Sequence, residues 1–222
     1  MSPMTRSTLF RVLASLALAT SIAAAQAPDD KQIAQERAQA ELDVPKLTDV
    51  LGLQPGMTVA DVGAGFGAMT VVLGKSIGTG HVFATDIGER QLSVIRDYVK
   101  REGLINVTVI EGATASTNLP PACCDAVFLQ NVYHHIVSVS EFNASLKASL
   151  KPGGRLAIID FVPTKGSELP KGVPANRGGH GVPPSVVIEE MKAAGLLHVQ
   201  TIDKWPPGDK NPAAFLALFK AP

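Results

Sequence analysis

The glycine turn formed by Gly63, Gly65 and Gly67 is the stretch of the sequence best suited to holding a ligand. Alternating glycines leave no Cβ to block a ligand, and they tolerate backbone angles that other residues avoid. An apolar run precedes the turn and a helical pattern follows it, so amides at the helix start would face a bound group. The acidic residue Asp61 stands two positions before the first glycine. The pattern indicates a turn that cradles a nucleotide-like cofactor.

A second group of side chains with chemical potential lies at the end of another apolar run, and comprises Asn131, Tyr133, His134 and His135. A histidine in this place could serve as a general base near neutral pH. The alternative is that one of the two histidines packs in the core or caps the next helix.

The other three histidines are weaker candidates. His180 lies in a long glycine-rich loop and is expected to be solvated; the alternative is that this loop closes over the acceptor. His81 and His198 stand at the starts of predicted strands and are assigned to structure. The histidines lack the spacing of a metal-ligand set and no carboxylate joins them. We therefore expect no metal site.

Apolar strands and amphipathic helices alternate along the chain. Strands are predicted over 57–62, 81–86, 106–111, 125–131 and 155–161, and helices over 43–51, 67–76, 89–102 and 139–150. Continuous apolar strands separated by helices are typical of a parallel sheet covered on both faces. Ligands of such sheets bind at the carboxyl ends of the strands, where both groups of reactive residues fall.

The last third of the chain departs from this alternation. A long loop is predicted over 163–184, followed by a helix from Ser185 and by two strands over 198–205 and 214–220. Two successive strands without an intervening helix should pair antiparallel. The predicted fold is α/β, a Rossmann-like three-layer sandwich whose mostly parallel seven-stranded sheet ends in an antiparallel hairpin. Residues 28–42 would form a polar helix or lead-in before a domain at 43–222.

Length and charge narrow the function classes. The chain has 222 residues, 45% of them apolar, which suits one domain rather than two. Its 20 basic residues balance 20 acidic ones, and it has one Trp and two Tyr. We therefore expect no nucleic-acid partner, because neither a basic patch nor an aromatic stacking surface is indicated.

Residues 1–27 have the pattern of a signal peptide. Arg6 and Arg11 form a basic start, the run from Val12 to Ala25 is apolar, and Ala25-Gln26-Ala27 has the small-x-small pattern of a processing site. The run is short for a bilayer span, which needs roughly 20 residues. Export to the periplasm or medium is predicted; an organelle transit peptide and an uncleaved anchor are the alternatives. The oligomeric state is not indicated.

The two cysteines, Cys123 and Cys124, are neighbours in the sequence. A bond between neighbours closes a strained ring. We expect a partly buried, unbridged pair, with an intermolecular bridge as the alternative.

Two cofactor classes fit the glycine turn. Gly63-x-Gly65-x-x-Ala68 satisfies the dinucleotide fingerprint, and Asp86 lies about where that fingerprint places its ribose acid. A carboxylate at Asp61 would repel a pyrophosphate on the turn, whereas an ammonium or sulfonium group would be attracted. The acid and the terminal hairpin favour a sulfonium cofactor over NAD(P).

The stretch Asp61-Val62-Gly63-Ala64-Gly65-Phe66-Gly67 resembles the first motif of class I S-adenosylmethionine-dependent methyltransferases. The resemblance runs in order from Val44 to Lys220. It includes Asp86, the Tyr133-His134-His135 stretch and Leu150-Lys151-Pro152-Gly153-Gly154. Within the family, the chain is most similar to small bacterial methyltransferase-like proteins that begin with a signal peptide.

The resemblance implies a role for each site residue. Gly63, Gly65 and Gly67 would approach the methionine portion of S-adenosylmethionine, and Asp61 would face its ammonium group. Asp86 would accept the ribose hydroxyls. Ile87 and Gly112 would border the adenine, and Asn131 would border the cofactor beside His134, His135 and Tyr133. The chain departs from the family at Ala113, where many members carry an acid that contacts the adenine amino group.

Two further hypotheses accompany methyl transfer to a small-molecule or lipid-like acceptor. Ala113 and the predicted export motivate a protein that binds S-adenosylmethionine without catalysing transfer. An NAD(P)-dependent reductase with an unusual turn is the third hypothesis.

Overall fold

Seven strands form one sheet in the computed structural model, which describes residues 30–206 and 213–222. The strands are β1 (Thr58–Val62), β2 (His81–Asp86), β3 (Val107–Glu111), β4 (Cys124–Gln130), β5 (Leu150–Phe161), β6 (Leu197–Asp203) and β7 (Ala214–Lys220). The helices are α1 (Asp30–Leu51), α2 (Ala68–Ser76), α3 (Glu89–Arg101), α4 (Val139–Ser149) and α5 (Pro184–Ala193), with short 3₁₀ helices η1 (Tyr133–His135) and η2 (Ala175–Arg177). The predicted signal peptide lies outside the described residues, and so do residues 207–212 between the last two predicted strands.

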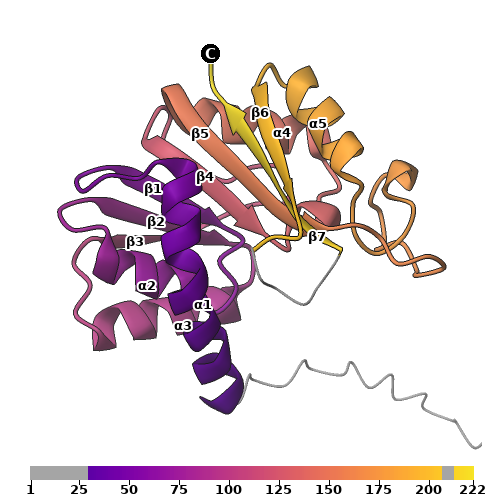
Figure 1. Ribbon diagram of the computed structural model, residues 1–222. Helices are drawn as coiled ribbons and strands as arrows, with labels where there is room; N and C mark the ends of the chain where they lie inside the picture. The colour runs from indigo at the N-terminus through magenta and orange to yellow at the C-terminus, as the bar shows by residue number, and fades with distance from the viewer. Residues whose placement is uncertain (1–29, 207–212) are drawn as a thin grey trace, which may run out of the picture.

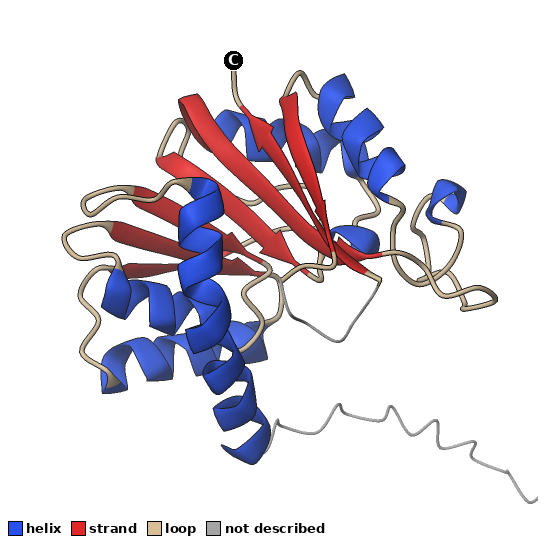
Figure 2. Cartoon of the chain, viewed as in Figure 1, coloured by secondary structure: helices blue, strands red, loops and turns tan. Residues whose placement is uncertain are grey.

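The sheet has the order β3-β2-β1-β4-β5-β7-β6. Strands β1 to β5 are parallel, whereas β7 is antiparallel to both β5 and β6. Helices cover both faces of the sheet (Figures 1 and 2). The predicted fold class, including the terminal hairpin, is confirmed. Between β1 and β4 the strand order reverses, which is where an open parallel sheet leaves a crevice for a ligand.

The core consists of two apolar clusters, one on each face of the sheet. One contains Tyr133, Phe142 and Met191 from η1, α4 and α5, and the other contains Leu47 and Leu73 from α1 and α2. The central strand β4 contributes to both clusters, because residues 126–129 are all apolar and successive side chains point to opposite faces. This explains why the middle of the strand is a continuous apolar run.

Helix α1 replaces the two N-terminal elements predicted over 28–42 and 43–51. It runs without interruption through Pro45, although proline removes one helical hydrogen bond. Ala40, Val44 and Leu47 are buried on one side of the helix across this position. Packing of that stripe therefore holds the two halves together. Figure 1 shows α1 lying across one face of the sheet.

Strand β5 starts earlier than predicted. Leu150 already pairs with Cys124, and the pairing shifts register between Cys124 and Ala126. Residues 151–154, which fall between the predicted helix and the predicted strand, belong to the strand. Gly154 also accepts a backbone hydrogen bond from Ala221 of the terminal segment, which stabilises this extension.

Cys123 and Cys124 are joined by a disulfide bond, with their Cα atoms 3.7 Å apart. The prediction of an unbridged pair is therefore wrong. The irregular pairing at the start of β4 places the two sulfur atoms side by side, with Cys124 buried and Cys123 beside the carbonyl of Ser149. Among the described residues, none of the helices is both long and apolar enough to cross a bilayer.

Candidate cofactor and acceptor site

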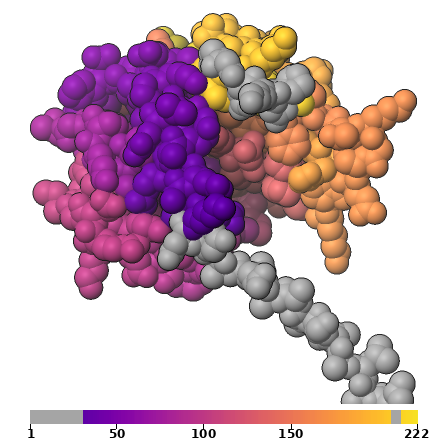
Figure 3. Space-filling view, turned by 60° about the horizontal axis from the view of Figure 1, so that its bottom comes forward, coloured from indigo at the N-terminus to yellow at the C-terminus, as the bar shows by residue number. Residues whose placement is uncertain are grey.

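Two cavities open side by side at the carboxyl edge of the sheet. The first has a volume of about 310 Å³ and is lined by Asp61, the glycine turn and residues of α1. The second has a volume of about 440 Å³ and is lined by residues that follow β2, β3 and β4. Gly63 and Asn131 line both cavities. A single ligand with two unlike ends could therefore occupy both. Figure 3 shows a hollow on this side, between indigo α1 and the orange segment before α5.

Glycine is required in this turn, both by the space available for a Cβ and by the positive backbone angle φ. Gly63 has a φ of 74°, and a Cβ there would lie 2.4 Å from Cγ2 of Val132. Gly65 has a φ of 55°, and a Cβ there would meet no atom within 4 Å. Gly65 thus leaves open space beside the first cavity. Gly67 does not line either cavity and instead faces Ile95 of α3, so its predicted contact with the cofactor is not supported by the geometry.

Asp61 is a buried acid in the wall of the first cavity. Only 3% of the residue is exposed, and Thr70 Oγ1 donates a 2.6 Å hydrogen bond to its Oδ2. Burial raises the pKa of Asp61 to about 7, and the nearby Asp86 contributes in the same direction. A cationic group in the cavity would favour the ionised carboxylate. The residue therefore fits an ammonium group.

Helix α1 adds further acids to the first cavity. Glu36 and Asp43 line it together with Gln39. Asp43 is buried, its Oδ2 accepts from Gln39 Nε2, and its Oδ1 accepts no hydrogen bond, although Lys46 Nζ lies 3.6 Å away. A buried carboxylate oxygen that accepts no hydrogen bond strengthens the match to a cationic ligand. Sequence reasoning missed these residues because the polar N-terminal segment was not expected to reach the site.

Asp86 connects the two halves of the site. Its Oδ2 accepts from the Gly65 amide at 2.9 Å and its Oδ1 accepts from the Gly88 amide at 3.0 Å. Each carboxylate oxygen keeps another acceptor position. Asp86 lines the second cavity, so it can hold the glycine turn and still accept from ligand hydroxyls.

The other predicted cofactor residues surround the second cavity. Ile87 and Gly112 line it, and Ile87 is 62% exposed. Asn131 takes a φ of 57°, a conformation that asparagine tolerates better than most residues. Thr114, Ser116 and Thr117 also line this cavity, and no pattern in the sequence pointed to their hydroxyls. Ala113 pairs through its backbone with Ser116.

Tyr133 is not a catalytic candidate in the structure. The side chain is fully buried, and its hydroxyl donates to Glu190 and accepts from Asn143, both at 2.8 Å. Burial and the Glu190 carboxylate raise the pKa of the Tyr133 hydroxyl far above its usual range. The residue therefore joins α4 and α5 instead of facing either cavity, so this geometry does not support its predicted catalytic role.

His135 lines the second cavity, whereas His134 is buried behind it. Burial, together with His134 and His180, lowers the pKa of His135 below its ordinary value. Its imidazole is therefore neutral at pH 7 and has a lone pair available. His180 lies against both residues, with ring centroids 4.8 Å from His134 and 5.5 Å from His135. His180 is exposed in its loop, as expected, but its contact with the two histidines of η1 was not predicted.

The sheet order, the glycine turn and the paired cavities define a Rossmann-like domain that binds a nucleoside cofactor with a cationic end. Residues 60–158 match the family model described as a methyltransferase domain.

Known proteins share this domain. A ubiquinone/menaquinone biosynthesis C-methyltransferase of Vibrio campbellii is 30% identical over 115 residues, which cover 51% of this chain and 44% of the relative. A protein of the same name from Marinomonas sp. is 30% identical over 112 residues, with 50% and 45% covered. The matches thus cover less than half the length of these curated relatives.

Solved structures agree with this relationship. An S-adenosylmethionine-dependent methyltransferase from Aquifex aeolicus superposes with a TM-score of 0.68 at 28% identity, covering 88% of this chain and all of the other. Geranyl diphosphate C-methyltransferase from Streptomyces coelicolor shares the fold, with a TM-score of 0.65 at 16% identity and coverage of 86% and 83%. The chain is therefore similar to S-adenosylmethionine-dependent methyltransferases over this stretch, and S-adenosylmethionine is the cofactor that these likenesses support.

Proposed function

We propose that this protein transfers a methyl group from S-adenosylmethionine to an apolar small-molecule or lipid-like acceptor. The observation that carries the proposal is the junction of the two cavities at Gly63 and Asn131. The acidic first cavity suits the methionine end, and the second cavity suits the adenosine and leads to His135. Bound there, the cofactor supplies an electrophilic methyl group on a sulfonium.

The side chains would divide the work between binding and proton transfer. Asp61 and Asp43 would bind the ammonium group, and Asp86 would accept from the ribose hydroxyls. Gly65 leaves room for the backbone to approach. His135, as a neutral imidazole at the cavity wall, can take a proton from an acceptor hydroxyl or carbon acid. Orientation within a closed site contributes much of the rate of such a displacement.

An apolar acceptor is supported by the surface around the second cavity. Val137 and Ile87 line that cavity and are 49% and 62% exposed. Exposed large apolar side chains that line a cavity mark a site for an apolar partner. The names of the relatives from Vibrio refer to ubiquinone and menaquinone biosynthesis, so quinone precursors are the first acceptors to test.

The direct test combines calorimetry with a transfer assay on the purified chain. We expect saturable binding of S-adenosylmethionine and S-adenosylhomocysteine, no binding of NAD(P), and transfer of labelled methyl to a component of a lipid extract. Absence of binding to both methyl-donor species would refute the proposal. Tight binding without transfer to any fraction would favour the silent binding module suggested by Ala113.

We also propose that the chain is exported. The basic and apolar pattern of residues 1–27 supports this, and so does the Cys123–Cys124 disulfide, because disulfides persist mainly in oxidising compartments. Mass spectrometry of the protein from fractionated cells should find a shortened N-terminus outside the cytoplasm. Full-length protein confined to the cytoplasm would contradict export.

A further inference from the structure

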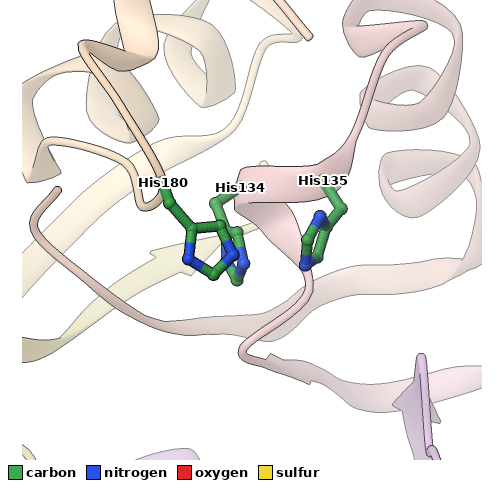
Figure 4. Close-up of side chains that lie close together, drawn as sticks. All are labelled: His134, His135 and His180. Atoms are coloured by element: carbon green, nitrogen blue, oxygen red, sulfur yellow. The ribbon is translucent and has the colours of Figure 1, made fainter. Parts of the chain in front are cut away.

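Three imidazole rings meet at the carboxyl edge of the sheet. His134 and His135 come from η1, and His180 comes from the loop between β5 and α5. One ring nitrogen of each residue lies within 4.8 Å of those of the other two. Figure 4 shows the three rings side by side, with His180 reaching toward the pair on η1. The sequence separates His180 from this pair by more than forty positions, which is why its spacing did not reveal the cluster.

A buried carboxylate holds the innermost ring. Asp160 Oδ1 lies 2.8 Å from His134 Nδ1, and its Oδ2 accepts from the His134 amide at 3.1 Å. This pairing places the ring proton on Nδ1 and leaves the lone pair of Nε2 free. Metal-ligating histidines commonly donate their second ring nitrogen to a carboxylate in this way. Within the part of the chain that the structure describes, the ring nitrogens of His135 and His180 form no hydrogen bond.

Hydrogen bonds also hold the backbone around His180 in place. The His180 amide donates to Ser167 Oγ at 2.9 Å, and the Val182 amide donates to the Phe161 carbonyl at 2.9 Å. A Cβ on Gly179 would lie 2.6 Å from Ser167 Oγ, and one on Gly181 would lie 2.8 Å from the Phe161 carbonyl oxygen. Glycine on both sides therefore lets this loop approach β5 closely and bring His180 to the pair.

We propose that His134, His135 and His180 form a binding site for a divalent transition metal of the zinc class. Three imidazole nitrogens are the donor set that zinc takes in catalytic sites, where a fourth position stays open for another ligand. Asp160 acts as a positioning residue that orients His134. Modest rotation of the two exposed rings would shorten the nitrogen separations to those of a common metal centre.

A metal at this site would restrict which acceptors can bind, and this consequence rests on the proposed function. His135 also lines the second cavity, so a metal bound to it would lie at the cavity wall. Its open position would bind an acceptor through a hydroxyl, thiol or carbonyl group. Metal coordination of such a group lowers its pKa or polarises it, which would take over the proton-accepting role assigned to a metal-free His135.

Zinc binding can be measured without cofactor or acceptor. The folded protein is stripped with a chelator, dialysed and titrated with Zn²⁺ against a chromophoric competitor. We expect one equivalent to bind, and His135→Ala and His180→Ala each to weaken binding by at least about 100-fold, beyond the loss typical of an outer partner. His198→Ala is the matched control, because that ring bonds Thr201 elsewhere, and it should bind as the unaltered protein does.

Asp160→Asn tests the positioning role. Loss of an outer-shell carboxylate should weaken zinc binding by roughly 10- to 100-fold and alter the visible spectrum of the Co²⁺-loaded protein. Circular dichroism checks that each variant is folded. If Asp160→Asn does not fold, His135→Ala and His180→Ala still test the metal site. Binding of less than one equivalent, or unchanged affinity in His180→Ala, would overturn the metal site. Zinc binding without methyl transfer would keep the metal site and count against the proposed function.

Discussion

The Thr70 hydroxyl donates a 2.6 Å hydrogen bond to Oδ2 of Asp61, a carboxyl group that is almost completely buried beside the glycine turn. Hydrogen bonds from the hydroxyl and the backbone of Thr70 are a small compensation for removing a charge from water. The carboxylate is therefore destabilised in the free protein and stabilised when a cation enters the first cavity. This makes Asp61 a residue whose contributions to stability and to binding have opposite signs.

Asp61→Asn should separate those two contributions. An amide keeps a hydrogen bond with Thr70 but carries no charge, so the free protein should be more stable at pH 8. Affinity for S-adenosylmethionine should fall by about 1.5–3 kcal/mol, the usual value of a hydrogen bond to a charged group. Calorimetry and urea denaturation measure the two effects. Thr70→Ser keeps the hydroxyl and is the control; equal affinity in Asp61→Asn would show that the acid does not meet the ammonium group.

The same residue predicts a pH dependence. The pKa of Asp61 is about 7 in the folded protein and near 3.8 when unfolded. Between pH 3.8 and pH 7, Asp61 is protonated in the folded chain and ionised in the unfolded chain. Protonation of Asp61 therefore stabilises the fold at low pH, and this stabilisation is lost as pH rises through 7. Cofactor affinity should change oppositely and increase as pH rises through 7. Denaturation at pH 5.5 and pH 8 should show this difference in the unaltered protein and not in Asp61→Asn.

A pair of glycine variants tests the open space in the first cavity. Gly65→Ala and Gly103→Ala both place a side chain at positive φ, 55° and 65°, with no atom within 4 Å. Each should lose about 1–2 kcal/mol of unfolding free energy for the left-handed backbone. Only Gly65 lines the first cavity, so only its variant should bind S-adenosylmethionine more weakly. Equal affinities in the two variants would place the cofactor elsewhere.

Tyr133→Phe tests the structural role found for this residue. Removing the hydroxyl leaves Glu190 and Asn143 without their shared partner, and each unsatisfied buried group costs about 1–3 kcal/mol. We expect a lower melting temperature and unchanged cofactor affinity. Asn176→Ala is the control, because Asn176 also bonds Glu190 but is exposed. Its melting temperature should fall by less. A Tyr133→Phe protein that is as stable as the original, but inactive, would return Tyr133 to the reaction.

Sequence patterns predicted most of the fold because the strands are continuous apolar runs between amphipathic helices. The antiparallel ending followed from two strands without a helix between them. Local patterns were misleading where distant packing decides: burial of the stripe on α1 overrides Pro45, and the register shift at Cys124 brings the two cysteines into a bond.

In the candidate site too, some residues could be predicted from local patterns and others depend on distant packing. Asp61, Gly63, Gly65 and Asp86 lie on one strand–turn–helix unit and the strand beside it, so their proximity could be read from the chain. The acids of α1 and the hydroxyls after β3 reach the cavities through tertiary packing. Tyr133 could not be distinguished from His135 by position, because its burial depends on Glu190 of α5, far along the chain.

Helix α1 and the His180 loop both lie outside residues 60–158, the stretch shared with the methyltransferase domain family. The shared stretch supplies most of the lining of both cavities, including the glycine turn and Asp86. Glu36 and Asp43 of α1 complete the lining of the first cavity, whereas Asp160 and His180 contact His134, the neighbour of His135 in the second. In the proposed function, the common segment and α1 together recognise the donor, whereas the choice of acceptor would also depend on the His180 loop, which can diverge independently of that segment.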